Sequence, residues 1–447
     1  MTSKWRNSTF AVGLLGLTIS APLAAQSKSY TVTDLGPAGN PFSVANFLNN
    51  HGVIAGSDTV VAGSASASHA VLWYKDLLVD IKAIVDLQQP GLLGPNSAAG
   101  FVNDSGLVVV GGETPNPDPN NENFCGTGTG LQCVVFLLRN GVLSQLRNPL
   151  GGTNSFPGAF NNRGEVAGFA ENAMHDHECL ATAPNGTGPQ VLDYEAVIWG
   201  PGPGQFRQLP PLTGDSVGIA LGMNDQGQVV GVSGRCGNTV IPGFVAGPHS
   251  VLWEADGSVH EIPNFGGTSN PAVLAVGNAA LAINNKGQVA GTSALPGSMV
   301  NQPFIWSKEK GLQHLQLIPG DVVGAGLGIN SGGEVVGASI SPGGPATGNP
   351  SAVVWQNGAE GGVTDLNRFL AANSPFTALL TAFGINDAGD IVGFGVTNTG
   401  DVHAFLAMPA RGASAGSVET AAPAASHAIA LSEKVRALVF GRFAIGR

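Results

Sequence analysis

The chain has 447 residues, of which 66 are Gly and only 11% are Asp, Glu, Lys or Arg, and its formal net charge is −11. Residues 28–409 carry 12 basic and 28 acidic side chains, so this part of the chain has a net charge of 12 − 28 = −16. A strongly acidic body repels phosphate backbones, and the composition therefore argues against nucleic acid as a partner. The many glycines are typical of tightly packed sheets with frequent turns.

The first 25 residues have the pattern of a secretory signal peptide. Two basic residues, Lys4 and Arg6, precede an apolar run from Phe10 to about Leu23, and small residues follow it. This run is too short and wrongly flanked for a lasting transmembrane helix, and no later segment is long and apolar enough to span a bilayer. The sequence therefore predicts that residues 1–25 are removed and that the mature protein is soluble and exported.

The following segment repeats one short phrase, an apolar residue followed by Asn-x-x-Gly and alternating apolar residues, as in AINNKGQVAG at 282–291. Successive lead asparagines are separated by between 46 residues (284 to 330) and 63 residues (161 to 224). A period of this size is typical of propeller blades. The seven lead residues are Asn49, Asn103, Asn161, Asn224, Asn284, Asn330 and Asn386.

Each phrase predicts a β-hairpin. The asparagine can hydrogen-bond its own backbone at the first corner of a type I turn, and the glycine can take the positive φ that a following bulge requires. The second strand then contains another glycine, which indicates that a neighbouring backbone passes very close. These strand glycines are Gly56, Gly111, Gly168, Gly231, Gly291, Gly337 and Gly393.

A second phrase follows each hairpin, as in HAVLW ending at Trp73 and HSVLW ending at Trp253. Every tryptophan of the chain except Trp5 falls at the end of this phrase, which suggests a packing position. A polar turn and a fourth apolar run come next. Each unit therefore supplies the four strands of a propeller blade.

The two ends of the repeat region predict how the ring closes. The seventh unit stops after HAFLAMP and lacks a fourth strand, whereas YTVTDLGPAGNPFS at 30–43 looks like a fourth strand with its following loop. Sharing one blade between the two ends removes the exposed edges of an open array. We therefore predict an all-β fold, a seven-bladed propeller over residues 28–409 whose last blade is completed by an N-terminal strand. An open solenoid remains the alternative.

With these two phrases, residues 30–408 resemble the bacterial extracellular repeats of the HAF family, whose tripeptide stands intact here at His403, Ala404 and Phe405. The resemblance implies an exported bacterial repeat protein and carries no established activity or catalytic residue. Other units have Cys133, Glu195, Gln302 or Ser351 where the histidine stands, which argues against a required role for that imidazole.

The four cysteines predict two disulfides in an exported protein. Cys125 and Cys133 bracket a short stretch of one inserted loop, and we expect them to pair. Cys179 and Cys236 lie in the corresponding loops of the next two units, which neighbouring blades would bring together. Free, buried or intermolecular thiols are the alternative, because sequence does not fix connectivity.

Three short motifs could carry chemistry, and each has a simpler interpretation. HDHEC at 175–179 offers metal-binding side chains but lacks a second ligand pair at zinc-like spacing, so we interpret it as a solvated loop. GDSVG at 214–218 matches a hydrolase motif outside its strand-turn-helix setting, so Ser216 is interpreted as a turn residue. The Asn-Asp-x-Gly turns offer one carboxylate each, too few for calcium. The sequence therefore predicts no catalytic residue, no metal site and no cofactor.

The connection between the second and third strands is lengthened in three consecutive units, at 113–133, 170–194 and 233–249. Loops added at one equivalent position of successive repeats gather on one face of the array, which is often the binding face. This pattern predicts a recognition surface on blades 2 to 4. Tolerated surface decoration is the alternative interpretation.

The C-terminal segment differs from the repeats. Residues 410–426 form an Ala/Ser/Gly/Pro-rich stretch typical of a flexible linker. Residues 427–447 form a basic amphipathic tail that could make weak contact with an anionic membrane surface. A frayed tail, or one docked on the acidic propeller, explains the pattern equally well.

The sequence favours an exported, non-catalytic repeat protein that binds or organises a protein or polysaccharide of the cell surface or matrix. Its support is that the repeated residues all have packing or turn explanations. The alternative is an extracellular carbohydrate-active enzyme whose site lies on the long loops of blades 2 to 4, with Asp176 and Glu178 as candidate carboxylates. The fold class does not decide between them.

Overall fold

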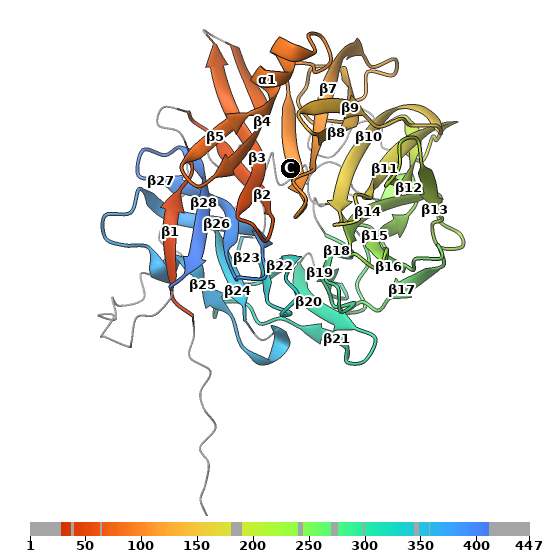
Figure 1. The fold of residues 1–447 in the computed structure, drawn as a ribbon. Coiled ribbons are helices and arrows are strands. Elements are labelled where there is room, and N and C mark those ends of the chain that lie inside the picture. Colours follow the sequence, from red (N-terminus) through yellow and green to blue (C-terminus); the bar gives the residue numbers. More distant parts are fainter. Residues whose placement is uncertain are drawn as a thin grey trace, which may run out of the picture.

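The computed structural model describes residues 28–36, 40–62, 65–179, 190–239, 245–269, 276–297, 300–343, 348–356 and 358–410. These residues form seven four-stranded antiparallel sheets arranged around a central axis, a seven-bladed β-propeller (Figure 1). The predicted signal peptide, the predicted tail and all of the predicted linker except Ala410 lie outside the described residues. No helix in the described ranges is long and apolar enough to cross a membrane.

The blades follow one another along the chain, with the innermost strand first. Blade 1 contains β2 (Ser43–Leu48), β3 (Val53–Ala62), β4 (Ala65–Tyr74) and β5 (Leu77–Asp80). Blade 2 contains β6 (Ser97–Val102), β7 (Val108–Pro117), β8 (Leu131–Arg139) and β9 (Val142–Gln145). Blade 3 contains β10 (Gly151–Phe160), β11 (Val166–His175), β12 (Leu192–Trp199) and β13 (Phe206–Leu209). Blade 4 contains β14 (Val217–Met223), β15 (Val229–Gly234), β16 (His249–Trp253) and β17 (Val259–Ile262).

The remaining three blades complete the circle. Blade 5 contains β18 (Ala279–Ile283), β19 (Val289–Ala294), β20 (Asn301–Ser307) and β21 (Gly311–His314). Blade 6 contains β22 (Val323–Ile329), β23 (Val335–Ile340), β24 (Pro350–Trp355) and β25 (Thr364–Asp365). Blade 7 contains β26 (Phe376–Ile385), β27 (Ile391–Thr397), β28 (Val402–Pro409) and, from the other end of the repeat region, β1 (Tyr30–Asp34).

The ring closes as the sequence predicts. Strand β1 pairs antiparallel with β28, in a register that runs from Tyr30 opposite Pro409 to Asp34 opposite Phe405. The junction with blade 1 is also packed, because the buried indole of Trp73 belongs to the same apolar cluster as Val392 of β27. A closed propeller, and not an open solenoid, is therefore the fold of this chain.

The hairpin turns have the predicted geometry. In blade 1 the N–H of Gly52 donates to the carbonyl of Asn49 (3.2 Å), and the N–H of Asn49 donates to the carbonyl of Val53 (3.0 Å). Gly52 has φ of 78°, a left-handed conformation that costs glycine little. The Asn49 Oδ1 accepts from the N–H groups of His51 and Val53, which fixes the corner. The prediction of an asparagine corner and a glycine bulge is confirmed.

The same asparagines also join the blades to one another, which the sequence analysis did not predict. The Nδ2 of Asn49 donates to the backbone carbonyl of Asn103 in the next blade (3.0 Å), and each buried asparagine repeats this bond until Asn386 donates to Asn49 (3.3 Å). The circle is closed by Asn103 to Asn161, Asn161 to Asn224, Asn224 to Asn284, Asn284 to Asn330 and Asn330 to Asn386. These seven side chains, called the asparagine ring below, tie together the ends of all seven innermost strands.

The strand glycines are required by a second bulge. In blade 4 the register of β14 shifts between Ala220 and Gly222, so the residue between them, Leu221, has no partner on β15. A Cβ at Gly231 would lie 1.9 Å from the carbonyl oxygen of Ile219, just before this bulge. In six of the seven blades, a Cβ at the strand glycine would collide in this way with a carbonyl oxygen of the innermost strand. Blade 2 is the exception, because the nearest atom to a Cβ at Gly111 is Pro157 Cδ at 3.3 Å. The predicted close backbone is therefore that of the blade's own innermost strand.

The tryptophans occupy the predicted packing position and add a hydrogen bond between blades. The indole Nε1 of Trp253 donates to the carbonyl of Pro210 (2.6 Å), which follows the outermost strand of the preceding blade. Trp73, Trp199 and Trp355 bond in the same way to Leu35, Arg147 and Gln316. The indole thus fills the space between two blades and also satisfies a carbonyl that has left the sheet.

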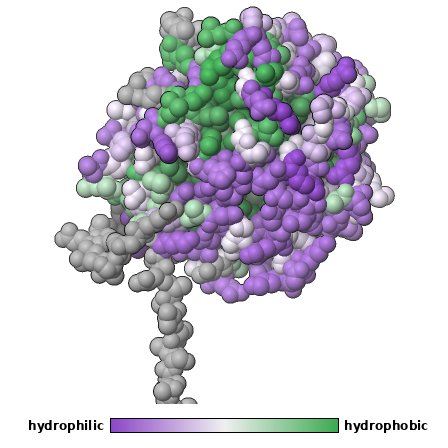
Figure 2. All heavy atoms as spheres, viewed as in Figure 1, coloured by the Kyte–Doolittle hydropathy of each residue, from purple (hydrophilic) through white to green (hydrophobic). Residues whose placement is uncertain are grey.

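Short helices interrupt this regular pattern. Helix α1 (Ile81–Gln88) follows β5, is N-capped by Asp80 and buries Ile81 and Val85. Three 3-10 helices, η1 (Cys236–Asn238), η2 (Gly358–Glu360) and η3 (Leu366–Phe369), lie in other connections. Figure 2 shows hydrophobic residues gathered over the strands of blade 1 and α1, where Leu87 is 87% exposed. The sequence analysis did not predict α1.

Candidate ligand-binding pocket

The propeller has two faces, and the predicted loops lie on one of them. The asparagine ring marks the face at which each innermost strand ends. The opposite face carries the starts of those strands and the connections between second and third strands. The described parts of the three lengthened connections therefore lie on this second face, as predicted, at 118–130 in blade 2, at 176–179 and 190–191 in blade 3, and at 235–239 and 245–248 in blade 4.

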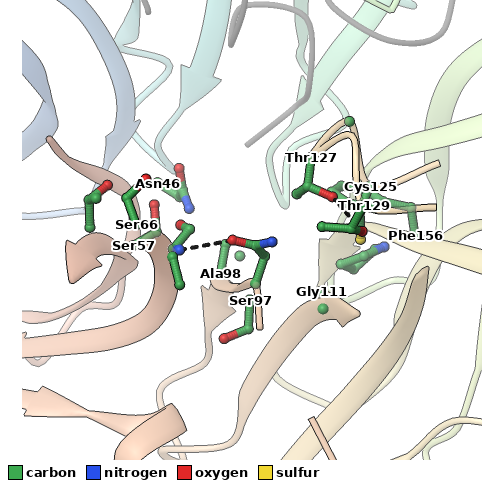
Figure 3. Close-up of a pocket in the computed structure, with 18 of the residues that line it drawn as sticks. Asn46, Ser57, Ser66, Ser97, Ala98, Gly111, Cys125, Thr127, Thr129 and Phe156 are labelled. Carbon is green, nitrogen blue, oxygen red and sulfur yellow. Dashed lines mark hydrogen bonds between the residues drawn. The ribbon is translucent and has the colours of Figure 1, made fainter. Parts of the chain in front are cut away.

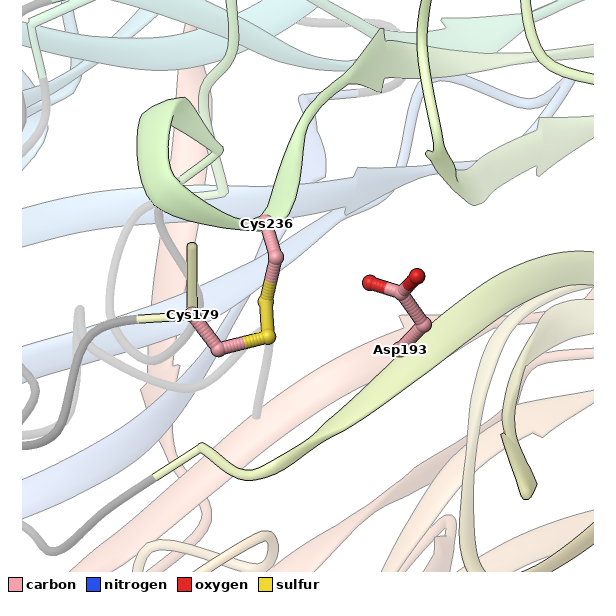
Figure 4. Close-up of side chains that lie close together, drawn as sticks. All are labelled: Cys179, Asp193 and Cys236. Carbon is pink, nitrogen blue, oxygen red and sulfur yellow. A yellow bond between two sulfur atoms is a disulfide. The ribbon is translucent and has the colours of Figure 1, made fainter. Parts of the chain in front are cut away.

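Two disulfides hold these loops, in the predicted pairing. Cys125 and Cys133 join the loop of blade 2 to the start of β8, with Cα atoms 5.3 Å apart. Cys179 and Cys236 join the loop of blade 3 to that of blade 4, with Cα atoms 4.6 Å apart. Figure 4 shows Asp193 of β12 beside this second disulfide. Because both sulfurs of this disulfide are oxidised, neither is available as a thiolate metal ligand.

A pocket of about 350 Å³ opens on the loop-bearing face between blades 1, 2 and 3. In Figure 3 one wall comes from the strands of blade 1 and the opposite wall carries Cys125, Thr127 and Thr129 of the blade 2 loop. Among the described residues, no Asp, Glu, Lys, Arg or His lines this pocket. Its hydrogen-bonding side chains are Asn46, Ser57, Thr59, Ser66, Ser68, Asn96, Ser97, Thr127 and Thr129, and its larger apolar ones are Phe101, Phe156 and Pro157.

At the pocket the repeat changes at one position of the innermost strand. The residue left over at the bulge of the innermost strand is Leu221, Leu281, Leu327 or Phe383 in blades 4 to 7. In blades 1 and 2 it is Asn46 and Gly100, which both line the pocket. In blade 3 it is Gly158, where a Cβ would lie 1.9 Å from the carbonyl oxygen of Ala220, so this glycine is required by a close backbone. A Cβ at Gly100 would meet nothing closer than 3.9 Å, so a leucine there would fill space that is now open.

A buried carboxylate orients one wall of the pocket. Glu113 is fully buried, and its Oε1 accepts from the hydroxyls of Thr127 and Thr129. Its Oε2 accepts from the backbone N–H (3.1 Å) and the Nδ2 (2.9 Å) of Asn96. Since both threonine hydroxyl protons are directed to Glu113, the oxygen of Thr127 is left to accept a hydrogen bond from a ligand, whereas that of Thr129 already accepts from the N–H of Leu131 (3.3 Å).

The opposite wall carries polar atoms with unused capacity. Asn46 Oδ1 and Thr59 Oγ1 are buried and have no hydrogen-bond partner among the described residues. Ser97 Oγ accepts from the N–H of Ala70, which leaves its own proton free to donate. The pocket therefore combines donors and acceptors without a formal charge.

A second, smaller cavity of about 150 Å³ lies on the axis at the asparagine ring. Its three carboxylates belong to the Asn-Asp-x-Gly turns and accept hydrogen bonds from the neighbouring blade: Asp104 from Asn50 (2.9 Å), and Asp387 from Ser331 (2.9 Å). Asp225 likewise accepts from the N–H of Asn162 (2.7 Å). These carboxylates reinforce the turn geometry, and the first pocket is the better candidate for a ligand.

The motifs considered in the sequence do not line the pocket. In HDHEC, His175 ends β11 and is exposed like His177, Glu178 pairs with Arg235 (3.5 Å) and Cys179 is in the disulfide. Asp176 lies near Asp193, and burial together with this second carboxylate raises the pKa of Asp193 to about 7. Ser216 lies in the connection before β14, where its N–H donates to the carbonyl of Gly234 (2.9 Å).

The histidines of the second phrase are used within their blades. His403 lies 3.0 Å from Asp34 of β1, and this hydrogen bond raises the histidine pKa. His69 pairs with Asp80 (2.8 Å), and His249 pairs with Glu261 (2.9 Å). Each pair joins the third strand to the outermost strand or its end, away from the pocket.

The pocket lies on the predicted face, but it lies at blades 1 to 3 and not at blades 2 to 4. Of the lengthened loops, as far as the structure describes them, only that of blade 2 lines it. Sequence reasoning missed Asn46, Gly100, Ser97 and the wall from β3 and β4. The available signal was the loss of the bulky bulge residue in three consecutive units, which becomes informative once the bulge position is known.

No known family model matches this chain, and no curated protein matches it. Among solved structures, streptogramin B lyase is 9% identical and aligns over 84% of this chain and 97% of its own, with a TM-score of 0.44. TolB from Acinetobacter baumannii is 11% identical over 80% of both chains (TM-score 0.38). Porphyromonas gingivalis dipeptidyl peptidase 4 is 11% identical over 78% of this chain and 49% of its own (TM-score 0.37). Likenesses this distant carry no argument about function, and the strand pairing itself establishes the propeller.

Proposed function

We propose that this protein is an exported, non-catalytic propeller that binds a neutral, hydroxyl-rich ligand, namely a short segment of a cell-surface or matrix polysaccharide, in the pocket of blades 1 to 3. The observation that carries the proposal is the lining of that pocket: within the part of the chain that the structure describes, it consists of nine hydroxyl or amide side chains and two phenylalanines, with no ionisable group. The two disulfides are consistent with an oxidising, extracytoplasmic compartment.

Sugars match this lining for two physical reasons. Each sugar hydroxyl both donates and accepts, as do the serine and threonine hydroxyls around it. The half-buried rings of Phe101 and Phe156 can pack against the apolar face of a sugar. A charged ligand would lose its hydration here without gaining a counter-charge. The volume is at the lower end for a small-molecule site, which suits a short segment of a chain.

The same lining argues against glycoside hydrolysis in the pocket. That reaction uses a pair of carboxyl groups flanking the scissile bond. The nearest carboxylate named above, Glu113, is fully buried and accepts four hydrogen bonds from Thr127, Thr129 and Asn96. The alternative is a carbohydrate-active enzyme whose site lies on the long loops, with Asp176 and Glu178. It differs from the proposal in a measurable way, because such an enzyme would shorten the polysaccharide chains.

The test is binding of the purified mature protein to neutral and charged polysaccharides, with product size read in parallel. Ser66 is exposed at the pocket, so Ser66→Trp should obstruct it without disturbing the core. Met174 is 64% exposed at the end of β11, does not line the pocket, and makes Met174→Trp the matched control. We expect saturable binding to a neutral polysaccharide that Ser66→Trp reduces at least about tenfold, a loss of about 1.4 kcal/mol, and that Met174→Trp retains. Binding restricted to charged polysaccharides, binding indifferent to Ser66→Trp, no binding at all, or chain shortening would each overturn the proposal.

A further inference from the structure

A cluster of three buried carboxylates lies between blades 2 and 3, outside the pocket. Asp118 and Glu122 belong to the long loop of blade 2, and Glu171 belongs to β11 of blade 3. Asp118 is 6% exposed, and the two glutamates are fully buried. One oxygen from each residue lies within 4.8 Å of one oxygen from each of the other two. This group is called the acidic triad below.

The hydrogen bonds of the triad leave one ligand position open. Glu122 Oε1 accepts from the N–H groups of Val191 (2.6 Å) and Leu192 (2.9 Å) and from Gln190 Nε2 (3.3 Å). Glu122 Oε2 is buried and has no hydrogen-bond partner among the described residues. A buried carboxylate oxygen without a donor is costly unless a proton or a cation meets it.

The other two carboxylates of the triad are also held in place by hydrogen bonds. Asp118 Oδ1 accepts from the N–H groups of Asn120 and Glu122, and its Oδ2 accepts from Thr153 and Asn154. Glu171 Oε2 accepts from the N–H of Asn154 (3.0 Å), whereas its Oε1 has only a long bond (3.3 Å) from Gln190. The triad is therefore a preformed group of oxygens, anchored on both blades.

Blade 2 contains the same arrangement with neutral partners, which shows what the triad lacks. Glu113 accepts from the N–H of Asn96 at the start of its blade, as Glu171 does from Asn154. The second oxygen of Glu113 faces the hydroxyl donors of Thr127 and Thr129. The corresponding side of Glu171 faces carboxylates, which cannot donate when ionised.

No basic side chain compensates for this charge. Within the described ranges, none of the three carboxylates takes part in an ion pair with Lys, Arg or His. The environment therefore favours a bound positive charge, and such a charge would relieve the repulsion between the carboxylates.

We propose that the acidic triad binds a hard divalent cation of the calcium type, with one carboxylate oxygen each from Asp118, Glu122 and Glu171 as protein ligands and water completing the shell. Calcium takes oxygen ligands at about 2.4 Å in flexible geometry, so two ligands on opposite sides of the ion lie about 4.8 Å apart. The spacing within the triad meets this limit. The ion would fasten the long loop of blade 2 to blade 3.

This site does not depend on the proposed polysaccharide binding, and its test is separate. The chelator-treated mature protein is titrated with CaCl₂ by calorimetry, and its thermal unfolding is followed with and without calcium. We expect one ion per chain and, at calcium 100 times Kd, a Tm about 3 °C higher for a domain of this size. Glu171→Gln should weaken binding at least about tenfold and remove the Tm shift. Glu122→Gln is the second variant, in case Glu171→Gln does not fold.

Glu113→Gln is the matched control, because it changes a buried carboxylate at the equivalent place in blade 2 and should keep the calcium response. Absence of heat and of any Tm shift in the unmodified protein would overturn the proposal and leave a shared proton as the occupant of the triad. Binding that survives both Glu171→Gln and Glu122→Gln would also overturn it, since the ion would then sit elsewhere.

Discussion

Replacing Gly231 with alanine tests the link between the repeated sequence and the bulged innermost strands. The new Cβ would lie 1.9 Å from the Ile219 carbonyl oxygen and 3.1 Å from Ala220 Cα, whereas real Cβ contacts essentially never fall below 3.0 Å. The carbonyl must therefore move by at least 3.0 − 1.9 = 1.1 Å, although it is held by the pairing of β14 with β15. Overpacking of this kind costs about 1–3 kcal/mol, and weakening a ladder hydrogen bond adds about 1 kcal/mol.

We therefore expect Gly231→Ala to lower the free energy of unfolding by about 3 kcal/mol, which corresponds to a fall in Tm of about 4 °C for a domain of this size. Gly111→Ala is the matched control, because it changes the same repeat position in blade 2, where the new Cβ would lie 3.3 Å from its nearest neighbour, Pro157 Cδ. That variant should lose less than about 1 kcal/mol. Urea titration of both variants measures the difference, and equal losses would refute the role assigned to the close carbonyl.

Two further predictions address the asparagine ring and the carboxyl group of Asp193. Asn224→Ala removes the bond to Asn284 and the two bonds that fix its own turn, so we expect a loss of about 2–3 kcal/mol by urea titration; a loss as small as that of a surface Asn→Ala variant would contradict the ring's role. The pKa of Asp193 is raised to about 7 by burial and by Asp176, above its unfolded value of about 3.9. Between these pH values the folded state holds the extra proton, so this group makes stability fall as pH rises from about 4 to about 7. Asp193→Asn should flatten that part of a Tm-against-pH profile, and an unchanged slope would count against the assignment.

The number of blades, their strand order and the two disulfides could be predicted from sequence because they depend on local or repeated features. The Asn-x-x-Gly turn is specified by four consecutive residues, and strand alternation by neighbouring residues. The missing fourth strand of the last unit was visible as a missing phrase, so even the pairing of β1 with β28 could be inferred. Cys179 and Cys236 could be paired because loops at equivalent positions of adjacent blades must lie side by side.

The tertiary structure alone decided how the side chains of different blades meet. Asn49 is a turn residue in the sequence, and its bond to Asn103 exists only because the ring places the two turns within 3.0 Å. Gly100 cannot be told apart from the other 65 glycines in the sequence. Its role at the pocket becomes visible only when the bulge positions of the seven innermost strands are compared in the structure. The acidic triad unites residues 118, 122 and 171 across two blades. Local patterns specify the backbone of each blade, whereas a pocket or an ion site depends on contacts between blades, for which no short stretch of sequence carries the information.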